Sequence, residues 1–369
     1  MECYITRSGS YLPGAPVDND GIERFLGTMP GESGVKQQVL KMNGILRRHY
    51  AQDLEQRETE NVYQLAAQAV ERCLQADNLT ASSPAPAITF LAAGSTYAPY
   101  SGPGLASLIH PLIASRIQGL NRPLELSSHA GICTSAAAAL VNAVRAIRSG
   151  EHAAAIAVGA EHASEVLKSE VMKPIDDRSM HAELRNSQWF MSVFLRFMLS
   201  DGAGAFLLQN RPNEKGLSLV VDWTHSMSMA HECPLCMKLE NSTRLLSQDI
   251  RILNRHLFSA AESFALTALQ HHGEKLTNYK VVLPHLSSFF FRRKMEKMFE
   301  RLCDGLKTTV PYWTNLATAG NTGSASIYVM LDEYLDTHSL SHGDRLLLFI
   351  PESGQFNFVL VSLTAVVHG

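Results

Sequence analysis

Residues 127–136 read Ser127-Ser128-His129-Ala130-Gly131-Ile132-Cys133-Thr134-Ser135-Ala136. A strand-like stretch passes through a glycine and a cysteine directly into an Ala/Leu/Val-rich run that ends near Gly150 and predicts a helix. A cysteine at the N-terminus of a helix lies beside unpaired amide donors and the positive end of the helix dipole, which lower its pKa. Cys133 is therefore either a reactive thiol of lowered pKa or a buried core cysteine, and this segment alone favours neither.

Composition narrows the classes of function. The chain has 369 residues, of which 46% are hydrophobic and 18% charged, as is typical of a globular protein with a large core. Its formal net charge of −3 gives no electrostatic reason to expect a nucleic acid partner. No apolar run approaches the roughly 20 residues that a membrane-spanning helix needs, so no membrane insertion is expected.

The cysteines indicate a reducing compartment. Six are spread along the chain, and the N-terminus carries an acid, Glu2, where a secretory leader would be basic. We therefore expect a cytoplasmic protein without disulfides. The segment Cys233-Pro234-Leu235-Cys236 has the spacing of a metal or redox motif, but no second pair follows it at zinc-finger distance. We expect no metal site.

Apolar runs alternate with helical patterns along the whole chain. In the first part, the pattern predicts strands at residues 1–12, 87–93, 124–131 and 153–160, and helices at 59–76, 104–119 and 134–149. In the second part, it predicts strands at 203–209, 217–223, 280–284, 345–350 and 356–366, and helices at 248–271, 289–303 and, after a turn, up to residue 335. Buried strands separated by helices indicate an α/β fold with a sheet covered on both faces.

The second part contains a counterpart of the Cys133 segment. The stretch Thr318-Ala319-Gly320-Asn321-Thr322-Gly323-Ser324-Ala325-Ser326-Ile327 also turns through small residues into a helix. The two parts therefore suggest an internal duplication with a site between the halves. Residues 163–200 and 224–248 lack this regularity and are rich in Met, His and Arg, so we expect insertions that cover a pocket or an interface.

Several motifs resemble those of a known family. They are Gly131-Ile132-Cys133-Thr134-Ser135-Ala136, Asp201-Gly202-Ala203-Gly204-Ala205, Leu283-Pro284-His285, and Asn315-Leu316-Ala317 followed by Gly320-Asn321-Thr322-Gly323. In this order they resemble the thiolase-fold condensing enzymes of the β-ketoacyl-acyl-carrier-protein synthase III type. The closing Ile350-Pro351-Glu352-Ser353-Gly354 resembles the dialkylresorcinol-condensing branch, in which a synthase joins two acyl units and cyclises them to a cyclohexanedione.

The resemblance implies a fold and an assembly. The expected fold is a thiolase-like α/β fold, in which two duplicated βαβαβαββ halves form a layered α-β-α-β-α sandwich. The N-terminal half would span residues 1–200, with a cap insertion near 163–200, and the C-terminal half residues 201–369. In the resembled fold the strand at 153–160 lies near the twofold interface, so a homodimer is expected. Pairing with a related ketosynthase stays open.

The resemblance also implies chemical roles. Cys133 would be the nucleophile that takes an acyl group from a thioester. His285 and Asn321 would converge on Cys133 and donate hydrogen bonds to the carbonyl of a second thioester, where enolate charge develops. Taken singly, His285 is better read as a core histidine and Asn321 as a cap or turn residue. Together, at positions that match the family, the three residues favour the functional reading.

Two further residues complete the expected site. The backbone amides of Cys133 and Gly354 would polarise the acyl-enzyme carbonyl, although residues 351–356 depart from the glycine-run loop that is usual in the family. Glu161, directly after the strand at 153–160, would be an extra acid/base group. A salt-bridged surface carboxylate is an equal reading of Glu161.

The substrates would be thioesters of acyl carrier protein or of coenzyme A, with no tightly bound cofactor. Residues 37–43 lack the aromatic residue and the arginine that related enzymes use for coenzyme A, which favours a carrier protein. Basic residues that could receive an acidic carrier are Arg47, Arg48, Lys173, Arg185 and Arg196. Apolar residues that could line an acyl tunnel, or simply pack in the core, are Met172, Trp189, Phe190, Met191, Phe194, Phe197 and Met198.

Three functions follow as hypotheses. The first is a condensing enzyme that loads an acyl group on Cys133 and joins it to a β-ketoacyl thioester, with ring closure as an option. The second is an acyltransferase of the same fold that passes the acyl group to an oxygen or nitrogen nucleophile, with His285 as general base. The third, a non-catalytic partner subunit, is disfavoured because the cysteine, histidine and asparagine are all present.

Overall fold

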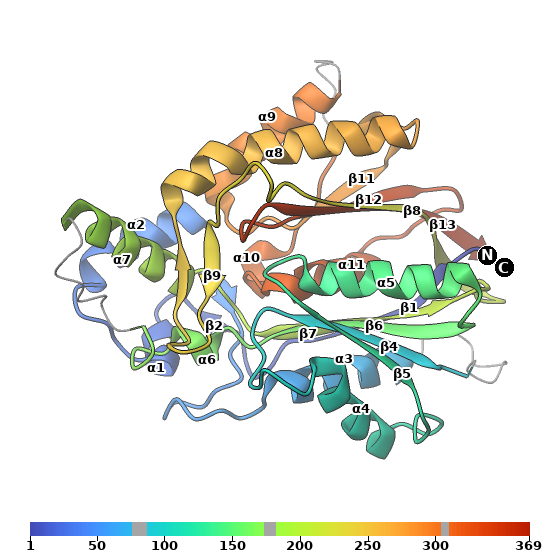
Figure 1. The fold of residues 1–369 in the computed structure, drawn as a ribbon, viewed down its shortest axis with the longest axis horizontal. Helices are drawn as coiled ribbons and strands as arrows, with labels where there is room; N and C mark the ends of the chain where they lie inside the picture. Colours follow the sequence, from blue (N-terminus) through green and yellow to red (C-terminus); the bar gives the residue numbers. More distant parts are fainter. Residues whose placement is uncertain (76–86, 173–181, 304–309) are drawn as a thin grey trace.

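The computed structural model describes residues 1–75, 87–172, 182–303 and 310–369, with residues 182–188 as backbone only. They form alternating layers of helix, sheet, helix, sheet and helix, as Figure 1 shows. This is the α-β-α-β-α sandwich that was expected. Within the described residues, no helix is long and apolar enough to cross a membrane.

The main sheet runs through the whole molecule in the order β11-β12-β13-β8-β1-β7-β6-β4-β5. A short antiparallel pairing of Tyr4 and Ile5 in β1 with Val220 and Leu219 in β8 joins its two parts, which Figure 1 shows as separate layers. The strands are β1 (Tyr4–Tyr11), β4 (Phe90–Ser95), β5 (Glu125–Ala130), β6 (Ala154–Glu161), β7 (Gly202–Gln209), β8 (Gly216–Ser228), β11 (Val281–Pro284), β12 (Arg345–Pro351) and β13 (Asn357–His368).

Paired helices make the three helical layers (Figure 1). One outer layer is α3 (Val62–Gln75) with α4 (Leu105–Arg116), the central layer is α5 (Ser135–Ser149) with α11 (Ser326–Thr337), and the other outer layer is α8 (Ile250–His271) with α9 (Arg292–Leu302). The central helices pack closely because α5 buries mainly small side chains. The buried Tyr328 hydroxyl of α11 donates to the Ala136 carbonyl of α5 at 2.8 Å, which joins the two helices.

Shorter elements form a cap at one end of the layers (left in Figure 1). It includes α1 (Ile22–Leu26), α2 (Ser33–Asn43), α6 (Ser164–Leu167), α7 (Ala182–Arg196), β2 (Val17–Asp18), β3 (Arg47–Arg48), β9 (Met237–Leu239) and β10 (Leu246–Gln248). The remaining short helices are α10 (Leu316–Ala319), η1 (Leu276–Asn278), η2 (Phe289–Phe291) and η3 (Gly323–Ala325). The sequence pattern did not predict α1 and α2.

The two halves have related but unequal topologies. The first half runs β1-α3-β4-α4-β5-α5-β6-β7, the expected βαβαβαββ order. In the described part of the second half, the strand between α9 and α11 is reduced to a single parallel bridge of Tyr312 with Val282. The expected boundary at residue 200 falls just before β7. Because β7 pairs with β1 and β6 of the first half, the sheet of that half continues to Gln209.

The strand expected at the dimer interface is not at an edge of the sheet. β6 lies between β4 and β7 and is buried along its whole length. The exposed edge of the first half is β5, whose residues are all exposed or half-buried. The reason is topological, because β4, β5 and β6 run parallel and β5, the middle one in sequence, takes the outside position.

Two arginines proposed to receive a carrier protein are instead buried anchors of the cap. Arg196 is fully buried, forms an ion pair with Glu32 at 3.1 Å, and donates to backbone carbonyls, including that of Leu26 at 3.2 Å. Arg48 is also fully buried and donates through Nε to the Phe197 carbonyl at 3.1 Å. The docking interpretation is wrong for these two. Arg47 is exposed, whereas Lys173 and the side chain of Arg185 lie outside the described residues.

The close contact of β4 with α5 generates a prediction about stability. A methyl group on Gly94 would lie 2.4 Å from the Ser135 carbonyl oxygen and 2.5 Å from the Ala136 nitrogen, both in the backbone of the first turn of α5. We expect Gly94→Ala to lower the free energy of unfolding by about 1–3 kcal/mol, because the helix start must move. Urea denaturation measures this change.

The matched control is Gly34→Ala on the exposed part of α2, where an added methyl group meets nothing within 4 Å. Its free energy of unfolding should stay unchanged or rise by up to about 1 kcal/mol. Equal stabilities of the two variants would contradict the packing argument.

Candidate active site

Polar side chains follow the carboxyl ends of the parallel strands. In the first half, Thr96 follows β4, Glu161 ends β6, and Cys133 lies three residues after β5. In the second half, His285 follows β11 and Glu352 follows β12, its parallel neighbour. Ligands of α/β proteins bind at this edge of a sheet, because the loops that leave it converge there.

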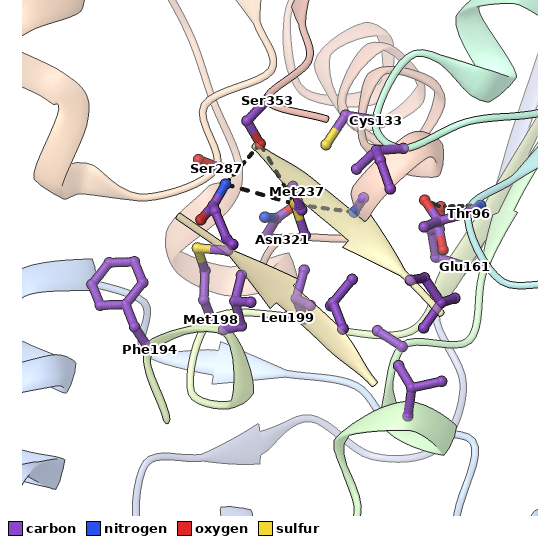
Figure 2. Close-up of a pocket in the computed structure, with 18 of the residues that line it drawn as sticks. Thr96, Cys133, Glu161, Phe194, Met198, Leu199, Met237, Ser287, Asn321 and Ser353 are labelled. Carbon is purple, nitrogen blue, oxygen red and sulfur yellow. Dashed lines mark hydrogen bonds between the residues drawn. The ribbon is translucent and has the colours of Figure 1, made fainter. Parts of the chain in front are cut away.

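Cys133 lies in the turn between β5 and α5, directly before the N-cap residue Thr134. Its sulfur points into the pocket that Figure 2 shows. No other described residue accepts the backbone N–H of Cys133 in a hydrogen bond. That amide is therefore free to polarise a carbonyl bound at the sulfur, as the sequence analysis predicts.

Two pockets meet at Cys133, and Leu257, Ser287, Phe291 and Ser353 also line both. One, which we call the cap pocket, adds Thr96, Tyr97, Ile132, Glu161, Ala163, Val166, Phe194, Leu195, Met198, Leu199, Met237, Leu239, Leu246, Gln248, Leu253, Asn321 and Gly323. The other, which we call the helix pocket, adds Phe258, Ala261, Pro284, His285, Leu286, Met295, Met298, Phe349 and Pro351. His285 thus lines one of the pockets that meet at Cys133, and Asn321 lines the other.

His285 is held as a neutral imidazole. It is buried, and its backbone N–H donates to the Phe349 carbonyl at 2.8 Å, which fixes the residue at the end of β11. Burial lowers the pKa of His285 to about 4. The Nε2 atom has no hydrogen-bond partner in the described part of the chain. A buried, unpaired ring nitrogen beside the thiol is available to a reacting group.

The side-chain amide of Asn321 is held by its oxygen and offers its nitrogen to the cap pocket. Its backbone N–H donates to the Met198 carbonyl at 3.2 Å, and its carbonyl accepts from Ser200 at 2.9 Å. The side-chain oxygen accepts from the Gly323 amide at 2.9 Å, which orients the group. Among the described residues, the Nδ2 donor has no recorded acceptor, so it can bind a carbonyl in the cap pocket.

Glu161 is buried in the cap pocket, so the surface salt-bridge reading of this residue is wrong. All of its hydrogen bonds end on Oε1, which accepts from the amide and hydroxyl of Thr96 at 2.8 and 2.6 Å and from those of Ser324 at 3.2 and 2.6 Å. Burial raises the pKa of Glu161, although these hydrogen bonds oppose the shift. Oε2 accepts from no described residue and is left for a reacting group.

Glu352 is the site residue that the sequence analysis did not identify. Its Oε2 accepts from the backbone amides of Ile132 at 3.2 Å and Thr134 at 3.1 Å, and from the Thr134 hydroxyl. It therefore binds the residues on both sides of Cys133 and leaves the amide of Cys133 itself free. The sequence did contain a signal for Glu352. It is a carboxylate directly after the buried strand β12, just as His285 comes directly after the neighbouring strand β11.

The expectation of a lowered thiol pKa is wrong. The pKa of Cys133 is raised well above its usual value, first by burial and then by the negative charges of Glu352 and Glu161. The start of α5 does face this segment, but Glu352 occupies the neighbouring amide donors that would have stabilised a thiolate. The resting nucleophile is therefore a neutral thiol.

Gly354 lies behind Ser353 in the loop that follows β12. Of the two residues, only Ser353 lines the pockets, and its hydroxyl accepts from Gln248 Nε2 at 2.9 Å. The Gly354 carbonyl accepts from the amides of Cys236 and Met237 at 2.9 and 3.1 Å, while its own amide donates to no described residue. An added Cβ there would lie 2.7 Å from Ile132 Cγ1, so glycine is needed for this loop to approach the Cys133 turn. The oxyanion role of Gly354 stays a prediction.

Both insertions contribute to the cap pocket, as expected. Of the apolar residues considered for a tunnel, Phe194 and Met198 line it (Figure 2). The other candidates pack in the core or against it, namely Met172, Trp189, Phe190, Met191 and Phe197.

Comparisons with known proteins agree with this arrangement. The model of the β-ketoacyl synthase N-terminal domain matches residues 128–213, which include Cys133 and Glu161. The β-ketoacyl-[acyl-carrier-protein] synthase III of Clostridium perfringens strain SM101 is 24% identical over 348 residues, which cover 92% of each chain.

Solved structures show the same fold. A tetronic acid condensing enzyme has a TM-score of 0.73 at 19% identity, with 100% of both chains covered. The 3-oxoacyl-[acyl-carrier-protein] synthase III of Aquifex aeolicus has a TM-score of 0.70 at 20% identity, covering 99% of this chain and 100% of the other. OleA of Xanthomonas campestris, with bound lauric acid and lauroyl-CoA, has a TM-score of 0.75 at 18% identity and covers 99% of both chains. The chain has the thiolase-like fold of type III ketosynthases and is related to them in sequence.

The position of Glu352 generates a prediction about the thiol. Because its negative charge raises the pKa of Cys133, we expect Glu352→Gln, which keeps an acceptor but removes the charge, to lower the pKa of that thiol. The rate of iodoacetamide alkylation at Cys133, followed by peptide mass spectrometry across pH, measures it.

The matched control is Glu300→Gln on the exposed face of α9, which should leave the alkylation profile unchanged. If the pH midpoint of alkylation in Glu352→Gln were equal to or higher than that of wild type, the charge of Glu352 would not be what raises the pKa of the Cys133 thiol.

Proposed function

We propose that this relative of the type III β-ketoacyl synthases is a condensing enzyme that loads an acyl group on Cys133 and joins it to a β-ketoacyl thioester. The observation that carries the proposal is the position of Cys133 where two pockets meet, with Asn321 and Glu161 in one and His285 in the other. Acyl carrier protein or coenzyme A would supply the thioesters.

The loading step needs a base, because the resting thiol is neutral. In the proposed step, the Cys133 sulfur attacks the thioester carbonyl while its proton passes to His285, whose Nε2 is unpaired. The carrier thiolate leaves and takes up that proton, so His285 returns to its neutral form. The free amide of Cys133, with that of Gly354, would hold the negative oxygen of the tetrahedral intermediate.

The condensing step needs a carbanion at the second thioester. Glu161 Oε2 would remove the proton from the carbon between the two carbonyl groups of the β-ketoacyl thioester, and its raised pKa suits it to accept that proton. The Nδ2 group of Asn321 would hold the enolate oxygen, and so would His285 with its proton on Nε2, the other tautomer of the neutral ring, while the carbon attacks the Cys133 acyl carbonyl. The carbon–sulfur bond then breaks, and the proton that Glu161 removed passes to the Cys133 sulfur, which returns Glu161 to its carboxylate.

The cap pocket indicates the kind of acyl group. Its lining beyond Glu161 and Asn321 is mostly apolar, which suits a hydrocarbon chain rather than a polar one. The resemblance of residues 350–354 to the dialkylresorcinol-condensing branch supports ring closure to a cyclohexanedione as the outcome. Mass and NMR analysis of the product decide this point, since an ester or amide product would instead indicate acyl transfer to oxygen or nitrogen.

Loading and condensation should separate by mutation. Cys133→Ser should abolish the acyl adduct that intact-protein mass spectrometry detects with wild-type enzyme, since a serine hydroxyl ionises far less readily than a thiol. Asn321→Ala should still load but should condense about 10²–10³-fold more slowly, because one donor to the enolate is lost.

The control is Asn254→Ala on α8, outside both pockets, which should load and condense like wild type. If Asn321→Ala loaded poorly but condensed at the wild-type rate once acylated, the proposed role of Asn321 in the condensing step would be wrong. Absence of any adduct on wild-type Cys133, with donors of all chain lengths, would overturn the proposed function.

We also propose that two copies pair through the edge strand β5. The support is that β5 is the outermost strand next to the Cys133 turn and that, in the described part of the chain, no strand pairs with its outer side. Light scattering should give the mass of a dimer at micromolar concentration. The mass of a monomer over that range would contradict the pairing.

A further inference from the structure

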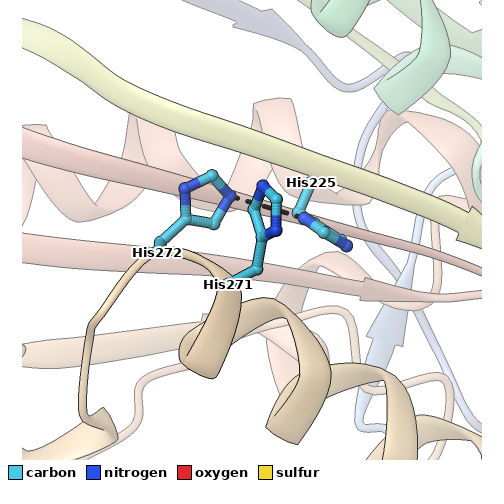
Figure 3. A group of neighbouring side chains, drawn as sticks. All are labelled: His225, His271 and His272. Carbon is cyan, nitrogen blue, oxygen red and sulfur yellow. Dashed lines mark hydrogen bonds between the residues drawn. The ribbon is translucent and has the colours of Figure 1, made fainter.

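Three histidines meet where the end of α8 approaches β8 (Figure 3). His225 lies on β8, His271 is the last residue of α8, and His272 follows it. One ring nitrogen of each lies within 4.8 Å of the others, and His225 Nδ1 is 3.4 Å from His272 Nε2. We call this group the histidine cluster. It lies outside both pockets.

Neighbouring rings hold the cluster in place. Trp223 lies two residues before His225 on the same face of β8, and its ring stacks on His272 with centroids 4.2 Å apart and planes 7° apart. Phe264 of α8 packs against His225 with centroids 5.7 Å apart. Fixed rings lose little freedom when they bind a ligand, so the cluster is partly preorganised.

The cluster offers imidazole rings as ligands. Neutral imidazole is the form that binds metals. Glu274 is already paired with Arg345 at 2.8 Å, so the ligands on offer are nitrogens.

We propose that His225, His271 and His272 form a binding site for Zn²⁺. With zinc–nitrogen bonds of about 2.0–2.1 Å, two nitrogens of a tetrahedral site lie about 3.3–3.4 Å apart, which matches the separation of His225 and His272. Nitrogen ligands favour Zn²⁺ and its late first-row neighbours over Mg²⁺ and Ca²⁺. The exposed side of His271 leaves a fourth position open to water.

The proposed Zn²⁺ site would have a structural role and would take no part in the reaction at Cys133. Leu257, which lines both pockets, lies about 21 Å from His271 along α8, at about 1.5 Å per residue. Zn²⁺ bound to the cluster connects the end of α8 in the outer layer with β8 in the sheet. Its binding free energy therefore stabilises the packing of that layer.

A second group among the described residues, Glu58, His162 and Glu165, is less suited to a cation. Glu165 already accepts from Lys168 at 2.6 Å and from Arg244 at 3.3 Å, so its charge is balanced. Another positive charge there would be repelled.

Titration calorimetry with ZnCl₂ on the untagged, chelator-treated full chain tests the proposal. Wild type should bind one equivalent, and Zn²⁺ should raise its thermal midpoint. His225→Ala and His271→Ala should each weaken binding at least about 10-fold and remove the thermal shift. The His271 variant is the safer one, because that side chain is exposed. His231→Ala, an equally exposed histidine outside the cluster, should bind like wild type.

The cysteines are the competing ligands, so two further measurements identify the donors. Co²⁺ in place of Zn²⁺ should give the visible spectrum of a tetrahedral nitrogen site without a sulfur charge-transfer band. Cys233→Ser/Cys236→Ser should bind Zn²⁺ like wild type. Failure of wild type to bind, wild-type affinity in both histidine variants, or loss of binding in the double cysteine variant overturns the site.

Discussion

The carboxylate of Glu352 is the interaction on which the geometry around the nucleophile depends. It follows β12 of the second half and accepts hydrogen bonds from the backbone on both sides of Cys133, in the first half. A negative charge is favourable at the start of α5, where amide donors are unpaired. The same charge opposes a second one on the sulfur. The Glu352 carboxylate therefore joins the two halves, leaves the Cys133 amide without a bond to it, and favours the neutral thiol.

Two of the reacting groups consequently carry no charge at rest. Burial disfavours the thiolate of Cys133 and the imidazolium of His285, and it raises the pKa of Glu161. The Cys133 amide and the Asn321 Nδ2 group, whose residues line the pockets, are instead dipoles without an acceptor in another described residue. Fixed dipoles in a buried pocket suit a reaction whose negative charge appears on one carbonyl oxygen after another, because they need no reorganisation when that charge develops.

The layered packing brings these groups together. Helix α5 can lie between the two parts of the sheet because its buried face is rich in small side chains, and Tyr328 joins it to α11. The turns at the starts of these helices then bring Cys133 and Asn321 to one pocket, while β11 brings His285 to the other pocket that Cys133 lines. The cap closes over them and is held by the buried Arg196–Glu32 pair. Breaking a buried pair of this kind leaves a charge without a partner. Arg196 therefore stays buried against Glu32 and is not available to bind a carrier protein.

The periodicity of the sequence determined the α/β class and the places of the main strands and helices, because periodicity is a local property of the chain. The layered arrangement followed from the resemblance of its motifs to a known family, and the convergence of His285 and Asn321 on Cys133 stays a prediction of that resemblance. Only the tertiary structure decided what depends on neighbours distant in sequence. It brought Glu352 into contact with Thr134, 218 residues earlier in the chain, and raised the pKa of Cys133 instead of lowering it. It also buried Arg48 and Arg196 and made β5 rather than β6 the edge strand. It also assembled His225 with His271 and His272. Charge, burial and strand order are set by three-dimensional contacts, and no pattern of nearby residues records them.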